Sequence, residues 1–252
     1  MADATTEAAN LLLAARRDPA KKLADLPAAV KPADRAAAYA IQRKIAESLG
    51  KIGGWKVSPF GADTPPMCGA LPASGIVASP AKLSSKTHAM RGIEAEISVR
   101  LGRDLPPRGT PYTSAEVIAA IASMHASIEV LESRFIEPNG LDVPTSLADS
   151  QGHGGFVYGA PVTAWQGVDL AHVSVEQFVD GAVTAGRTGH PAGDLVAQVV
   201  WMANEGSVWA GGLKAGQFVT CGSWTGAQRV GPTAAVRVKF STVGEALLTF
   251  TA

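Results

Sequence analysis

The sequence has few cysteines, no long apolar run and no excess of either charge. Its 252 residues contain only Cys68 and Cys221, too few for a disulfide framework and without the spacing of a metal-binding cysteine motif. The longest apolar runs, such as residues 11–15, are far too short to span a bilayer. Lys plus Arg and Asp plus Glu number 22 each, so no overall charge favours nucleic acid or an anionic membrane.

These absences leave a globular protein of a reducing compartment as the simplest interpretation. The composition is 46% hydrophobic and 17% charged, which indicates a well-buried core and not a disordered chain. The first residues, Met-Ala-Asp-Ala-Thr-Thr-Glu, are acidic, whereas a secretory signal begins with positive charge. We therefore expect a cytoplasmic protein with no nucleic-acid or membrane partner.

The N-terminal part is predicted to be helical. A helix capped by Thr5 or Thr6 is expected to extend to about Arg17, and a second to run from about residue 32 to Gly50. The breakers that follow, from Pro59 to Pro80, predict loops with short strands. We expect residues 1–85 to form a helical and loop segment.

Strand patterns predominate in the rest of the chain. The capping box that begins at Thr113 predicts a helix that extends to Met124, and Asp180-Gly181 predicts the turn of a hairpin. A further helix is expected at residues 194–204, and strands are expected at 217–221, 234–240 and 246–250. The pattern predicts an α+β fold, with a β-rich rolled sheet or barrel over residues 86–252 and the N-terminal helices packed outside it.

Three glutamates interrupt two strand-like segments. Glu94 and Glu96 lie in residues 92–99, and Glu129 lies in residues 127–130, among β-branched and apolar residues. Because strand side chains alternate, Glu94 and Glu96 share a face, about 7 Å apart. Like charges on an apolar strand are costly unless a cation neutralises them. The pattern indicates an oxygen-lined site for Mg²⁺ or Mn²⁺, although an E-x-E pair alone also fits the wet face of an edge strand.

The segments around these glutamates resemble the fumarylacetoacetate hydrolase-like superfamily. More narrowly, they are similar to its branch of 2-keto-4-pentenoate (2-hydroxypenta-2,4-dienoate) hydratases and 4-oxalocrotonate decarboxylases. The agreement follows the family's order from about residue 10 to the C-terminus. It is carried by residues 38–42, 54–57, 92–97, 101–106, 128–134, 147–150, 200–204 and 213–217.

The resemblance implies a divalent-metal-dependent lyase that acts on a small 2-hydroxydienoic or 2-oxo acid, and it also implies a homo-oligomer. Glu94, Glu96 and Glu129 would hold one Mg²⁺ or Mn²⁺ in an octahedral site, with three positions left for substrate oxygens and water. The ion would act as a Lewis acid towards the substrate carbonyl. Lys56 matches the family's active-site lysine and would transfer a proton or pair with the substrate carboxylate. Partial burial and the nearby cation would lower its pKa.

One position departs from the family pattern. Relatives have a Pro-Asp-aromatic-Gly run after the lysine, and its acid is a candidate for positioning or activating water. Here the run is residues 65–69, with Met67 at the place of that acid. Met67 puts the hydration step in doubt, so we expect proton exchange at C3 of a 2-oxo acid to be faster than hydration. His153, in a glycine-rich loop, is a candidate to replace the acid, although a solvent-exposed loop histidine fits the pattern equally well.

Two more residues are expected near the substrate. Arg134 follows the strand of Glu129, where it would bind substrate or, more simply, pair with a ligand glutamate. Ser223 occupies a family position near substrate, with a simple turn as the alternative. The sequence favours a hydratase and leaves open a decarboxylase, a hydrolase of C–C bonds and a non-catalytic metal-binding relative.

Overall fold

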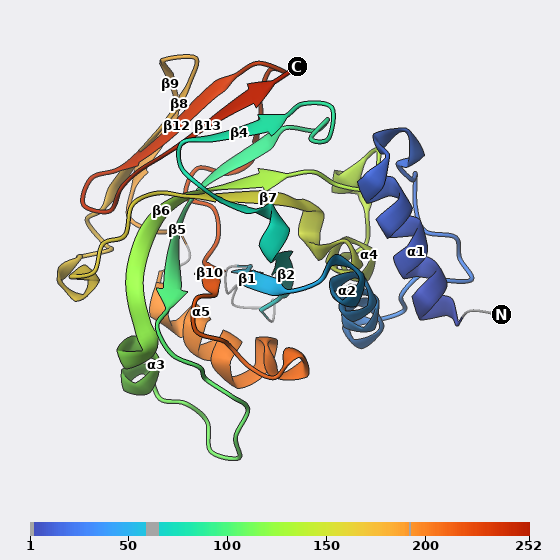
Figure 1. The fold of residues 1–252 in the computed structure, drawn as a ribbon, viewed down its shortest axis with the longest axis horizontal. Helices are drawn as coiled ribbons and strands as arrows, with labels where there is room; N and C mark the ends of the chain where they lie inside the picture. Colours follow the sequence, from blue (N-terminus) through green and yellow to red (C-terminus); the bar gives the residue numbers. More distant parts are fainter. Residues whose placement is uncertain (1–2, 59–65, 192) are drawn as a thin grey trace.

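Two β-sheets and five α-helices form the fold of residues 3–58, 66–191 and 193–252, the residues that this computed structural model describes (Figure 1). The helices are α1 (Ala4–Arg17), α2 (Arg35–Leu49), α3 (Ser114–Ala120), α4 (Val143–Ala148) and α5 (Leu195–Trp201). The strands are β1 (Ile52–Val57), β2 (Cys68–Pro72), β3 (Ile76–Ala78), β4 (Ala81–Ser84), β5 (Gly92–Leu101), β6 (Ile121–Leu131), β7 (His153–Tyr158), β8 (Ser174–Val179), β9 (Ala182–Thr188), β10 (Phe218–Thr220), β11 (Gln228–Arg229), β12 (Ala235–Phe240) and β13 (Gly244–Thr251).

The two sheets have different strand orders. The larger sheet runs β2-β1-β10-β5-β6-β7-β3, with β11 beside β5, and the smaller runs β4-β13-β12-β8-β9. The smaller sheet lies above the larger one in Figure 1, and β12 and β13 contact β6. The predicted α+β class with a β-rich core is confirmed. In the described part of the chain the sheets do not close into a barrel.

The main core lies between the two sheets. It is built from every second residue of their strands, whose side chains point inward. Ile97 and Val99 of β5, Ile128 of β6 and Val238 of β12 are fully buried there. Burial of such side chains stabilises each by about 1.5–3 kcal/mol relative to exposure. The long β5–β6 pair therefore has a rigid apolar support on one side, and its other side is free to carry polar groups.

A second core forms where α1, α2 and α4 pack together at one end of the larger sheet (Figure 1). Leu12 of α1, Ile41 of α2 and Leu147 of α4 meet around Phe135, which is 1% exposed. The alanine-rich sequences of α1 and α2 allow this close packing. None of the described helices has the length and apolar character that a membrane span requires.

Strands from before residue 86 belong to both sheets. β1, β2 and β3 extend the larger sheet, and β4 pairs with β13 in the smaller one. The expected division of the chain at residues 85 and 86 stays a prediction. Residues 59–65, where the sequence predicts loops, lie outside the described residues.

Three local predictions need correction, and one is confirmed. The first helix is capped by Asp3, whose carboxylate accepts from the Thr6 N–H, and not by Thr5 or Thr6. The helix after Thr113 ends at Ala120, because the chain continues as β6 and pairs with β5 along its length. The next helix ends at Trp201 and is followed by a π turn. The predicted hairpin turn at Asp180-Gly181 is confirmed, with φ of 51° and 83°.

We expect Phe135→Ala to lower the free energy of unfolding by about 3–5 kcal/mol, because it leaves a cavity in the helical core. Ile136→Ala is the matched control, since the neighbouring Ile136 is 57% exposed, and its effect should stay within about 0.5 kcal/mol. Urea denaturation measures both. Similar values for the two variants would contradict the assignment of Phe135 to the core.

Candidate metal centre

The three glutamates meet on the polar side of the β5–β6 pair. Glu94 lies directly opposite Glu129 in the antiparallel register, and Glu96 lies two residues further along β5. One carboxylate oxygen from each lies within 4.8 Å of the other two. Glu96 is 1% exposed and Glu129 is fully buried, while Glu94 is partly buried. The convergence expected from strand alternation is present, and metal ligation by these residues stays a prediction.

The cluster carries more negative charge than its protein surroundings neutralise. Burial and repulsion from Glu129 raise the pKa of Glu94, and burial with repulsion from both neighbours raises the pKa of Glu96 well above its usual range. Lys56 is the one cationic side chain that forms an ion pair with the cluster among the described residues. With all three carboxylates and Lys56 ionised, the cluster has a net charge of −2, which one divalent cation would balance.

Lys56 projects from β1 into this cluster. Its Nζ lies 2.7 Å from Glu129 Oε1 and donates to the Gln151 carbonyl at 3.4 Å. Burial opposes its positive charge, but attraction to Glu129 and Glu94 outweighs burial and raises the pKa of Lys56. The expected lowering of this pKa invoked a metal cation beside Lys56 and stays a prediction; without that ion, three carboxylates face one ammonium group.

The two oxygens of Glu129 have different surroundings. Oε1 forms the ion pair with Lys56 Nζ and lies 3.3 Å from His153 Nδ1. Oε2 is buried without a partner in the described structure. Burial disfavours the ionised form, but Lys56 and the His153 hydrogen bond outweigh it and lower the pKa of Glu129 to about 2. Glu129 is thus a carboxylate with one oxygen held and the other available to a cation.

His153 supports Glu129 from behind and is fully buried, so it is not a solvent-exposed loop residue. Burial lowers the pKa of His153 to about 4, so the imidazole is neutral and its Nδ1–H donates to the carboxylate, which can only accept. His153 is not among the residues that line the glutamate cavity. Its contact with Glu129 fits a positioning role, and the suggestion that it replaces the missing acid stays a prediction.

Glu96 is oriented by the segment after β10. Its Oε2 accepts from the Thr220 hydroxyl and, at 3.2 Å, from the Gly222 N–H. Gly222 has a φ of 91°, a backbone conformation that glycine adopts without strain. Because both bonds go to Oε2, they orient the carboxylate without using Oε1.

A cavity of about 310 Å³ opens onto the cluster. Besides the three glutamates, it is lined by Lys56, Val57, Ser58, Leu131, Gln151, Gly222 and Ser223. Lys56 and the glutamates are the only titratable groups among these lining residues. Ser223 is among these lining residues, and its contact with substrate stays a prediction.

Gln151 also lines this cavity, and the sequence analysis missed it. Its side-chain Oε1 is buried without a partner in the described structure. Ser150, Gln151 and Gly152 have consecutive positive φ values of 49°, 53° and 73°, a strained turn of the kind that recurs at functional sites. The turn directs the Gln151 carbonyl to Lys56. No local motif in the sequence indicates this conformation.

Arg134 lies outside the cavity lining, contrary to the expectation that it contacts substrate or a ligand glutamate. Its Nε donates to Asp149 Oδ1 in a buried ion pair. The rest of its guanidinium donates to the carbonyls of Glu132, Asp149 and His153 at 2.5, 2.5 and 2.6 Å. These bonds use four of the five N–H donors of the Arg134 guanidinium, and they tie the end of β6 to the turn that precedes β7.

Met67 also lies outside the cavity lining. Its backbone pairs with Ser58, and its side chain packs against the helical core. The substitution at the family's acid position therefore leaves a thioether in apolar contacts. Pro65, in the same motif, falls outside the described residues.

The donors that the structure brings together fit a hard divalent cation. All three are carboxylate oxygens, which Mg²⁺ and similar ions prefer. Glu129 Oε2 is buried and unpartnered among the described groups, and the cluster has uncompensated negative charge. Glu94, Glu96 and Glu129 would hold the ion, and the adjoining cavity would admit a small ligand to it.

Comparison with known proteins gives one sequence match and several structural ones. No protein-family model matches the chain. A 2-keto-4-pentenoate hydratase of Burkholderia vietnamiensis is 29% identical, over 81% of this chain and 79% of that protein. The 4-oxalocrotonate decarboxylase of Pseudomonas putida G7, complexed with magnesium and adipate, matches with a TM-score of 0.85 at 24% identity, over 98% of this chain and 97% of its own. The fumarylacetoacetate hydrolase of Exiguobacterium antarcticum matches with a TM-score of 0.61 at 16% identity, over 81% and 76% of the two chains.

We expect Glu96→Gln to weaken Mg²⁺ binding at least tenfold, because it removes one charge from the cluster but keeps the shape of the side chain. Isothermal titration calorimetry with MgCl₂ measures the affinity. Glu176→Gln, an exposed change on β8, is the control and should bind as the wild type does. Full Mg²⁺ binding by Glu96→Gln would remove Glu96 from the site.

Proposed function

We propose that this chain, a member of the fumarylacetoacetate hydrolase-like superfamily, is a divalent-metal-dependent lyase that acts on a small 2-oxo or 2-hydroxydienoic acid. Its first candidate reaction is the hydration of 2-hydroxypenta-2,4-dienoate. The observation that carries the proposal is the presence of three converging carboxylates and one buried lysine in a single cavity of about 310 Å³. That size suits a substrate of a few carbon atoms.

The three glutamates would hold Mg²⁺ or Mn²⁺, which when bound supplies Lewis-acid polarisation of the substrate's 2-oxygen. Lys56 supplies the proton transfer. Its Nζ lies at the glutamate cluster and lines the cavity, so it can reach a bound substrate. Gln151 and Ser223 offer neutral polar groups to the substrate, and Leu131 and Val57 offer apolar contact to its carbon chain.

The hydratase reaction consists of two proton movements and one addition. Ketonisation removes the proton of the 2-hydroxyl group and places a proton on C5, which leaves a C3–C4 double bond conjugated to the 2-oxo group. Water then adds its hydroxyl to C4 and a proton to C3 and yields a 4-hydroxy-2-oxo acid. Among the described residues that line the cavity, Lys56 is the only proton carrier besides the glutamates.

A decarboxylase is the second candidate, because the cavity lining supplies no further acid to activate water. In that reaction the electrons of the breaking C–C bond move into the 2-oxo acid framework as CO₂ leaves, and Lys56 returns a proton to carbon. Two candidate functions therefore share the same residues and differ in whether water is activated. Hydration ranks first because the sequence match is to a hydratase.

An assay of purified protein with Mg²⁺ separates the candidates. We expect loss of the dienoate absorbance with 2-hydroxypenta-2,4-dienoate. Release of CO₂ from 2-oxo-3-hexenedioate without hydration of the dienoate would favour the decarboxylase. Deuterium exchange at C3 of a 2-oxo acid, followed by NMR, reports proton transfer separately from hydration. The absence of a reaction in all three measurements would favour a non-catalytic metal-binding relative.

We expect Lys56→Met to lower kcat about 10²–10⁴-fold, because it removes the proton carrier but keeps an unbranched side chain. The control is Lys82→Met, an exposed change on β4, which should leave kcat unchanged. Mg²⁺ affinity measured on the same variants separates lost proton transfer from lost metal. A normal kcat for Lys56→Met would remove Lys56 from the mechanism.

A further inference from the structure

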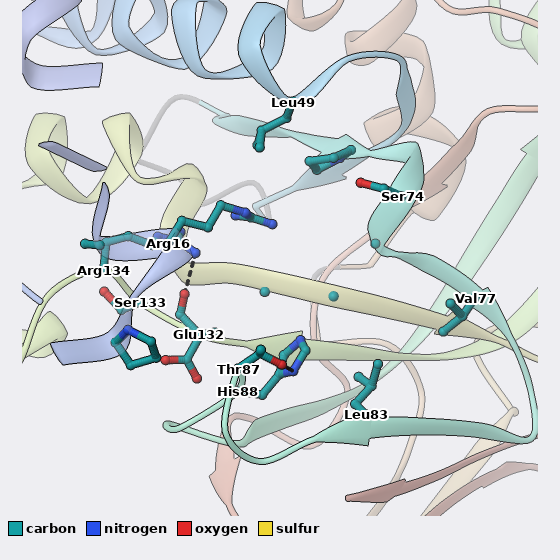
Figure 2. Close-up of a pocket in the computed structure, with 16 residues that line it drawn as sticks. Arg16, Leu49, Ser74, Val77, Leu83, Thr87, His88, Glu132, Ser133 and Arg134 are labelled. Atoms are coloured by element: carbon teal, nitrogen blue, oxygen red, sulfur yellow. Dashed lines mark hydrogen bonds between the residues drawn. The ribbon is translucent and has the colours of Figure 1, made fainter. Parts of the chain in front are cut away.

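We propose that a second cavity, on the other side of the turn before β7, binds a small organic carboxylate through Arg16. This cavity has a volume of about 260 Å³ and lies between α1, the β2–β3 connection, the segment after β4, and β7 (Figure 2). Its lining contains none of the glutamates of the candidate metal centre and not Lys56. The proposal stands independently of the proposed function.

Among the described residues, Arg16 forms no ion pair, although Asp149 and Glu132 lie near enough to attract its charge. Its guanidinium points towards Leu49 and Ser74 in Figure 2, and its NH1 donates to the His153 carbonyl at 3.2 Å. No described carboxylate forms an ion pair with it, although other arginines and lysines of the chain do form such pairs. Burial and the nearby Arg134 charge lower the pKa of Arg16 to about 10, so it remains charged at neutral pH.

The other charges of this cavity cancel. Arg134 is paired with Asp149. Glu132 is paired with Lys22 at 2.5 Å and also accepts from the Met90 N–H at 2.6 Å. One positive charge, that of Arg16, is therefore left over. A half-buried cation gains from a counter-ion, and the planar fork of a guanidinium matches a carboxylate with two parallel hydrogen bonds.

The walls of the cavity indicate an organic anion. Leu49, Val77 and Leu83 contribute apolar surface, which suits a short hydrocarbon chain. Gly155 forms part of the lining and has no side chain. A Cβ there would be in ordinary van der Waals contact with His88 Nε2 at 3.6 Å and with the Gly75 carbonyl and Leu83 at 3.7 Å. A larger side chain at position 155 would therefore compete for the space beside these residues.

Calorimetric titration of the chelated protein with sodium valerate tests this site. After EDTA has removed the metal and has itself been dialysed away, the glutamate cluster repels carboxylates, so one equivalent of bound valerate would report the second cavity alone. We expect Arg16→Met to weaken valerate binding by about tenfold or more, because it removes a charge-assisted hydrogen bond. Arg17→Met changes the exposed neighbouring residue and should bind as the wild type does.

A second variant tests the site sterically and leaves Arg16 in place. We expect Gly155→Val to weaken valerate binding at least tenfold, because its side chain competes for that space. Thermal unfolding of each variant checks that it is folded. Failure of the chelated wild type to bind valerate, or unchanged affinity in Gly155→Val or folded Arg16→Met, would overturn the proposal. Inorganic phosphate that binds as tightly as valerate would overturn the assignment to an organic carboxylate.

Discussion

The register between β5 and β6 is the constraint on which the candidate metal centre depends. It places Glu94 directly opposite Glu129 and keeps Glu96 on the same face. A shift of β5 by one residue would turn Glu94 and Glu96 towards the apolar core, to which Ile97 and Ile128 belong. The core thus fixes the register, and the register gathers three negative charges that repel one another. Lys56, Thr220 and the Gly222 N–H offset part of that repulsion.

The helical end of the molecule shapes the same site from a distance. Asp149 ends α4 and pairs with Arg134, and Arg134 in turn holds the carbonyl of His153. The strained turn at residues 150–152 lies between these fixed points. It brings the Gln151 carbonyl to Lys56, while the His153 ring reaches Glu129. The buried ion pair therefore helps to position two residues around the glutamates.

The two cavities differ in electrostatic character. One is lined by three carboxylates and a single lysine, and the other retains the unpaired charge of Arg16 among the described residues. They lie on different sides of His153, whose side chain contacts Glu129 and whose carbonyl accepts from Arg16. A cation suits the first cavity and an anion suits the second, so the same short segment borders two sites of opposite charge.

Local sequence patterns determined the glutamate face, the Asp180-Gly181 turn and the general α+β class, because each depends on strand alternation or on the conformation of a few adjacent residues. The tertiary structure alone decided that Ile121 and Met124 continue in a strand, because pairing with β5 prevails over their helix-like spacing. It also placed His153 behind Glu129, bound Arg134 to Asp149 and turned Gln151 into the cavity. These outcomes join residues that lie far apart in the chain or have an uncommon backbone conformation. Local patterns carry no signal for either.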